Sequence, residues 1–118
     1  MNYILLIYQG PNPTVPGTDR WNALPKREQG AIYADYTALN KTPGLTPGLP
    51  AGFPEKARTV QVRNGKPEVK DGTYLTESIA GYAVLEAENM EAAVALAARI
   101  PAARLGGAVE IRPSEQYW

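Results

Sequence analysis

Two segments of the chain carry apolar or small side chains at both alternating sets of positions, and this pattern restricts the fold more than any other feature. The first segment runs from Tyr3 to Tyr8 and the second from Ile79 to Glu86. Strands with this pattern are typically covered on both faces, whereas half-exposed strands alternate apolar with polar residues. Both segments are therefore predicted to lie centrally in a sheet that is shielded on both sides.

Two helices are predicted to connect the strands. The first spans Pro25 to Asn40, because its apolar residues recur at helical spacing after a proline suited to a first turn. The second begins after Asn89, which is a suitable N-cap, and ends before Pro101. Each helix then has one apolar stripe to bury against the sheet.

Proline and glycine occupy nearly every second position of residues 42–54, which predicts a long surface loop without regular structure. After this loop, Arg58 to Arg63 alternates apolar with polar residues, and Asn64-Gly65 provides the two positive-φ residues of a type I′ turn. The pattern predicts a short hairpin that returns over Pro67 to Lys70. A last strand is predicted over residues 108–112.

These elements predict an α+β fold in a single domain spanning residues 1–118. Without the short returning strand of the hairpin their order is β-α-β-β-α-β, the ferredoxin-like split arrangement with two helices on one face of an antiparallel sheet. The second face of the sheet then needs a cover. A second copy of the chain is expected there, with Tyr117-Trp118 as exposed aromatics or a subunit contact; the alternative is that the loop at residues 42–54 folds over the sheet.

Charge and composition exclude several classes of function. The chain has 12 Lys and Arg against 12 Asp and Glu, with no run of like charges, so nucleic-acid and membrane partners are disfavoured. The absence of His and Cys removes thiolate nucleophiles, imidazole bases and the usual ligands of zinc, copper, haem and iron–sulfur sites. No cofactor and no metal are predicted. Any catalysis would depend on Asp, Glu, Tyr, Lys, Arg or hydroxyl groups.

The N-terminal apolar run has features that bear on location. It has no Lys or Arg before it, is too short for the core of a signal peptide, and ends at Gly10-Pro11. Without Cys, the chain records nothing about the redox state of its compartment. The run is interpreted as a strand, and the expected location is the cytoplasm.

Several segments occur in an order that resembles a known family. They are the opening strand, the strand from Arg58 to Arg63 with its Asn64-Gly65 turn, the Asp71-Gly72 signature, Glu77, Gly81-Tyr82, and the ending from Ile100 to Pro113. Together they resemble the DGPF-type members of the YCII-related proteins. The resemblance covers nearly the whole chain and implies a ferredoxin-like subunit of a dimeric α+β barrel. The family has no settled activity, and some DGPF proteins resemble accessory partners of extracytoplasmic-function sigma factors.

Two departures from the family pattern bear on function. Thr73-Tyr74 follows the signature where the family name implies Pro and Phe. Related YCII proteins carry a His that is regarded as part of a catalytic pair, and this chain has none. The resemblance therefore favours a binding role over an enzymatic one.

Strand alternation predicts a group of polar side chains on the sheet face away from the helices: Gln61, Arg63, Tyr82, Glu110 and Arg112. In a space enclosed by two sheets, Arg63 or Arg112 could hold a carboxylate and Glu110 could act as a base. The alternative is that Glu110 forms a cross-strand or intersubunit ion pair with one of these arginines.

A second group of candidates belongs to the turn before the strand at Ile79. Asp71, Tyr74 and Glu77 lie there, and loops commonly carry binding groups on a rigid frame. Glu77 is a second candidate general base. The structural alternatives are that Glu77 accepts from backbone N–H groups and that Asp71 caps the turn with its own side chain.

Three functions follow from these features. The leading hypothesis is a small homodimeric protein that binds a small organic ligand in a pocket between sheet and hairpin. The second is a metal-independent enzyme that acts on a small organic acid or carbonyl compound, with Glu77 or Glu110 as base. Arg112 would then clamp the anion, and Tyr82 would donate a hydrogen bond. The third is an accessory partner of an extracytoplasmic-function sigma factor, which needs an exposed protein-binding surface.

Overall fold

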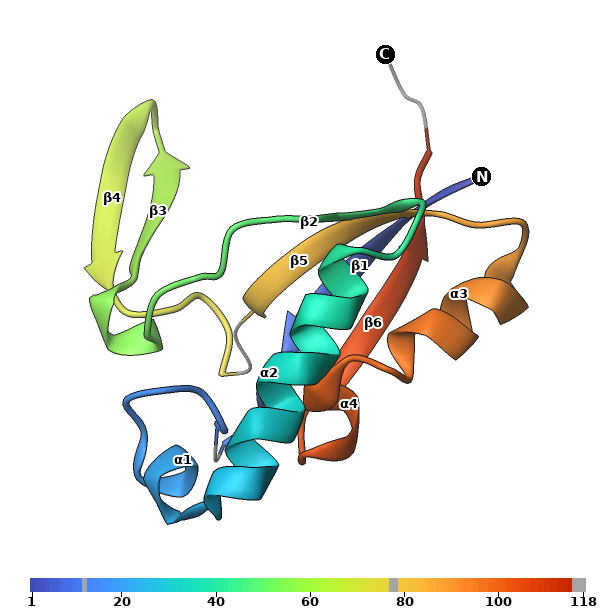
Figure 1. The fold of residues 1–118 in the computed structure, drawn as a ribbon. Coiled ribbons are helices and arrows are strands. Elements are labelled where there is room, and N and C mark those ends of the chain that lie inside the picture. The colour runs from blue at the N-terminus through green and yellow to red at the C-terminus, as the bar shows by residue number, and fades with distance from the viewer. Residues whose placement is uncertain (12, 77–78, 116–118) are drawn as a thin grey trace.

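The computed structural model describes residues 1–11, 13–76 and 79–115, which form an α+β fold with a four-stranded sheet and a separate two-stranded hairpin (Figure 1). The strands are β1 (Asn2–Tyr8), β2 (Leu45–Pro47), β3 (Arg58–Arg63), β4 (Lys66–Asp71), β5 (Ile79–Glu86) and β6 (Ala108–Pro113). The helices are α1 (Asp19–Ala23), α2 (Lys26–Asn40), the 3₁₀ turn η1 (Pro54–Lys56), α3 (Met90–Ala97) and α4 (Pro101–Arg104).

The main sheet has the strand order β2-β5-β1-β6, and every neighbouring pair is antiparallel. This is the order of the split β-α-β-β-α-β arrangement predicted from the sequence. The two strands predicted to be central, β1 and β5, are the inner strands. In the register, Leu5 lies between Ala83 and Ile111, so the apolar residues of three strands stand in one row.

The second strand of the sheet was predicted in the wrong place. β2 lies within the tract at residues 42–54 that was expected to be irregular, and it pairs with β5 at the edge of the sheet. The Gly48 and Ala51 N–H groups continue this contact by donating to the Tyr82 and Ala80 carbonyls, each at 2.8 Å. Pro47 is tolerated because an edge strand leaves one row of N–H positions unpaired.

The predicted hairpin is confirmed, but it is not part of the main sheet. Asn64 and Gly65 have φ values of 52° and 74°, as the type I′ turn requires. β3 and β4 pair with each other along their whole length and, among the described residues, with no other strand. Figure 1 shows the hairpin standing away from the four-stranded sheet.

The helices pack on one face of the main sheet and bury the core there (Figure 1). The cluster of buried residues contains Tyr3, Leu5, Leu39, Ala83, Leu85, Ala93, Ile100 and Ala102. An ion pair of 2.8 Å between Asp35 and Arg104 joins α2 to α4 outside this core. The apolar stripes of α2 and α3 therefore account for one face of β1 and β5.

The predicted helix limits are largely confirmed. α2 begins directly after Pro25 and ends at Asn40, and the Asn89 side chain caps α3 by accepting from the Ala92 N–H at 2.9 Å. α3 ends at Ala97, earlier than predicted, and Pro101 begins the short helix α4. The helix α1 was not predicted from the sequence, because its N-cap Thr18 lies among several Pro and Gly residues.

The other face of the sheet is open to water. Ile4, Tyr82 and Val84 point to this side, and their side chains are 37%, 49% and 40% exposed. The loop at residues 42–54 runs along the β5 edge, where the Tyr82 ring packs on Gly48 so closely that a Cβ at Gly48 would overlap it. The alternative that this loop covers the sheet is therefore wrong.

Two glycines allow the backbone to cross itself where β1 ends. A Cβ on Gly107 would overlap the carbonyl oxygen of Tyr8, and a Cβ on Gly10 would lie 2.5 Å from the carbonyl oxygen of Gly106. The Gly107 N–H also donates to the Ala102 carbonyl at 3.0 Å. Backbone atoms cannot move aside as a flexible side chain can, so this crossing requires glycine.

Two glycine-to-alanine substitutions should have opposite effects, because only Gly107 lies at the crossing and Gly30 does not. Gly107→Ala should lower the free energy of unfolding by at least ~2 kcal/mol, because the added methyl group has no room. Gly30→Ala, in the middle of α2 with open space around it, should raise it by about 0.5–1 kcal/mol. Urea denaturation of both variants tests this, and equal stabilities would contradict the close approach.

Candidate functional site

The open sheet face is the region where polar and apolar side chains meet. We define it by six residues of β1, β5 and β6: Ile4, Leu6, Tyr82, Val84, Glu110 and Arg112. Strand register places them together, because Leu6 lies between Tyr82 and Glu110 while Ile4 lies between Val84 and Arg112. The predictions for Tyr82, Glu110 and Arg112 therefore coincide with one surface.

Glu110 and Arg112 form an ion pair within this surface. Their Oε2 and Nε atoms are 3.9 Å apart, and their side chains are 52% and 69% exposed. The geometry agrees with the structural alternative of an ion pair, although the two residues lie on one strand and not on two. A pair this exposed stabilises the fold little and leaves both groups accessible to a ligand.

A hollow of about 550 Å³ opens beside the open sheet face, where β1 and β6 meet the loops. Residues that line it include Tyr8, Pro11, Leu75, Gly106, Ala108 and Glu110. Its volume lies within the usual range for small-molecule sites, roughly 300–1,000 Å³. Tyr8 and Glu110 bring a hydroxyl and a carboxylate to the same hollow.

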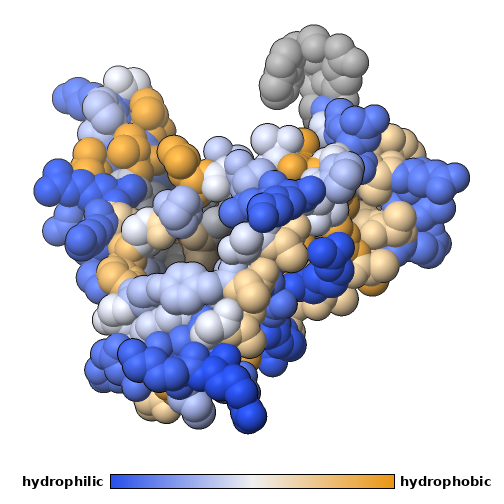
Figure 2. Space-filling view, viewed as in Figure 1, coloured by the Kyte–Doolittle hydropathy of each residue, from blue (hydrophilic) through white to orange (hydrophobic). Residues whose placement is uncertain are grey.

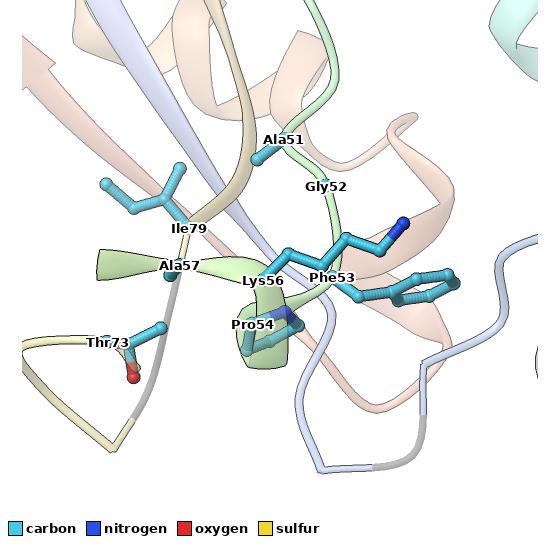
Figure 3. Close-up of a pocket in the computed structure, with 8 residues that line it drawn as sticks. All are labelled: Ala51, Gly52, Phe53, Pro54, Lys56, Ala57, Thr73 and Ile79. Atoms are coloured by element: carbon cyan, nitrogen blue, oxygen red, sulfur yellow. The ribbon is translucent and has the colours of Figure 1, made fainter. Parts of the chain in front are cut away.

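A smaller hollow of about 220 Å³ lies at the root of the hairpin (Figure 3). It is lined by the segment that leads into β3, including Phe53, Lys56 and Ala57, together with Thr73 and Ile79. Figure 3 shows that these residues come from three separate parts of the chain. This smaller hollow lies between the sheet and the hairpin, where a pocket was predicted from the sequence.

The structure corrects the prediction for Gln61 and Arg63. Both were expected beside Tyr82 on the sheet, but β3 pairs only with β4 in the described chain, which places them on the hairpin. Arg63 forms an ion pair of 3.4 Å with Glu68 across the hairpin. The short turn at residues 64 and 65 favours pairing with β4, and the edge position beside β5 is taken by β2.

The turn residues do not gather into one site. Asp71 ends β4 and pairs with Arg58 at 3.5 Å, with 93% of its side chain exposed. Tyr74 is 66% exposed in the segment that follows. Glu77, the second candidate base, and the terminal pair Tyr117-Trp118 lie outside the described residues.

Two residues of the larger hollow, Tyr8 and Leu75, were not predicted as site residues. Tyr8 was assigned to a strand but not to a site, although its position two residues after Leu6 places it on the same face. Leu75 follows the Thr73-Tyr74 pair and is 66% exposed at the hollow. No sequence signal marked Leu75, because its position depends on the path of the chain between β4 and β5.

Burial raises the pKa of Tyr36 on α2, while a hydrogen bond with Gln9 opposes this shift.

Residues 1–11, 13–76 and 79–115 contain no group of three or more Asp or Glu side chains that could together hold a metal ion. Within the same residues, no helix is long and apolar enough to cross a membrane.

A family model of the YCII-related domain matches residues 1–115. The chain therefore belongs to the YCII-related family. No curated protein matches the chain.

The exposure of Glu110 predicts that its substitution leaves the fold intact. Glu110→Gln should change the free energy of unfolding by less than about 1 kcal/mol, because the ion pair with Arg112 is long and open to water. Leu5→Ala, at a side chain that is 0% exposed, should lower it by about 2–5 kcal/mol. Chemical denaturation measures both, and a large loss for Glu110→Gln would make Glu110 a structural residue.

Proposed function

We propose that this YCII-related protein, as a DGPF-type member, is a homodimer that binds a small organic ligand between its subunits. The observation that carries the proposal is the open sheet face, where Ile4, Tyr82 and Val84 are between 37% and 49% exposed beside Glu110 and Arg112. Monomeric proteins rarely leave a contiguous apolar surface of this kind to water. A second copy brings the same patch through a two-fold axis and covers both faces at once.

The polar residues give this interface a ligand-binding character. Two sheets that face each other would enclose Glu110 and Arg112 of each subunit, together with the hydroxyl of Tyr82. Arg112 presents a planar cation that suits a carboxylate, and apolar neighbours exclude water from such a pair. A small organic acid is the ligand class that fits this combination.

A metal-independent enzyme is the second candidate, because Tyr8 and Glu110 line the same hollow of about 550 Å³. Glu110 would act as base toward a small organic acid or carbonyl compound held by Arg112. Tyr8 or Tyr82 would donate a hydrogen bond to the developing negative charge. Glu110→Gln would then abolish turnover while the melting temperature stays nearly unchanged.

The dimer predicts a difference between two exposed valines. Val84→Lys should convert the protein from a dimer to a monomer of 12.8 kDa, because it places a charge in the centre of the interface. Val94→Lys is the matched control, since Val94 is 52% exposed on α3 at the helical side of the sheet. Light scattering at micromolar concentration measures the masses. A monomeric parent protein would refute the proposal.

The ligand class predicts a difference between two exposed arginines. In a thermal-shift screen of small carboxylates, at least one compound should raise the melting temperature, because it binds the folded state alone. Arg112→Gln should remove most of that shift. Arg58→Gln is the matched control, since Arg58 is equally exposed and also paired with an acid, but lies on the hairpin. Equal losses in both variants would contradict a role for Arg112.

A further inference from the structure

The hairpin of β3 and β4 has two chemically different faces. Directly opposed residues of an antiparallel pair share a face, so the register assigns each side chain. One face, which we call the valine face, carries Val60, Val62, Pro67 and Val69, with the ion pair of Arg58 and Asp71 at its root. The opposite face carries Thr59, Gln61, Arg63, Lys66, Glu68 and Lys70. The hairpin is therefore amphipathic, as a strand pair that packs on a core would be.

The valine face is nevertheless mostly exposed in the described chain. Val60, Val62 and Val69 are 60%, 66% and 60% exposed. At its root the hairpin is held by two hydrogen bonds, from the Gly72 N–H to the Ala57 carbonyl and from the Thr59 hydroxyl to the Gly72 carbonyl. Figure 2 shows apolar side chains gathered on the hairpin beside the hollow that separates it from the body. An isolated two-stranded hairpin is only marginally stable in water, so this one needs a partner surface.

The dimensions of the chain indicate how large that partner surface is. The radius of gyration is 16.2 Å, whereas a compact domain of 118 residues has about 13.5 Å. The accessible surface is 8492 Å², whereas a compact monomer of 12.8 kDa exposes roughly 6,300 Å². The excess is on the order of 2,000 Å², well above the ~800 Å² that each partner of a standard interface buries.

The open sheet face alone cannot account for this excess, because it consists of six side chains that are already partly covered by their neighbours. The projecting hairpin adds three exposed large apolar residues, Val60, Val62 and Val69. Both surfaces belong to the same chain, and the chain has no net charge that would select a strongly charged partner. A second copy can cover both surfaces at once, because a two-fold axis makes each contact twice and closes the assembly.

We infer that the valine face of each hairpin packs against the second copy of the chain, along the margin of its open sheet face. This inference rests on the proposed dimer and adds a part to its pocket. The hollows at Glu110 and at the hairpin root are open to water in one chain, so each pocket lacks an outer wall. The partner's hairpin supplies that wall, and the ligand site is incomplete in a single subunit.

Two adjacent residues on opposite faces of β3 provide the test. Val62→Lys should raise the dimer dissociation constant by about tenfold or more, whereas Gln61→Lys, with the same change in charge, should leave it nearly unchanged. Sedimentation equilibrium of the full chain measures both constants. Val62→Thr keeps the branched shape that favours a strand and should show an intermediate effect, so misfolding of the lysine variant does not decide the result.

The outcomes separate this inference from the proposed function. A dimer whose dissociation constant is the same for Val62→Lys and Gln61→Lys would keep the dimer and overturn the role of the hairpin. A monomeric parent protein would overturn both.

Cross-linking gives an independent readout, because the chain has no Cys and a single cysteine can be labelled selectively. With a benzophenone label, Val62→Cys should yield a covalent dimer on illumination, and Gln61→Cys should yield far less. Cross-links confined to one chain would show that the valine face packs on its own subunit, and would overturn the inference.

Discussion

The structure depends on an imbalance between a sheet with two faces and helices that cover only one of them. β1 and β5 bury Tyr3, Leu5, Ala83 and Leu85 beneath the helices and leave the alternate side chains exposed. Because successive residues of a strand point to opposite faces, the chain cannot bury one set without presenting the other. The proposed dimer and its proposed pocket both follow from this geometry.

Local signals in the sequence predicted most of the fold. The two-sided apolar pattern identified the inner strands, the cap at Asn89 and the proline at Pro25 placed the helix starts, and Asn64-Gly65 specified the hairpin turn. The identity of the second strand could not be predicted this way. β2 is three residues long and contains Pro47, so its intrinsic propensity to form a strand is poor. Its pairing with β5 nevertheless makes it a strand.

The location of the candidate residues was predicted only where the alternation of side chains along a strand is enough to assign them to a face. Parity placed Tyr82, Glu110 and Arg112 on one face, because each lies in a strand of the main sheet. The same alternation gave the wrong location for Gln61 and Arg63, because it assigns a side chain to a face of its strand but does not tell which sheet the strand joins. Leu75 depends on the path of a connecting segment and had no signal at all.

The central position of β1 has a consequence for how the protein is made. Tyr3 pairs with Leu85 on one side and with Pro113 on the other, so this strand emerges from the ribosome long before either neighbour exists. Closing such distant contacts is entropically costly and slow. The apolar side chains of β1 stay unpaired until β5 and then β6 have been synthesised. Exposed apolar surface and unpaired strand edges of this kind favour aggregation before folding is complete.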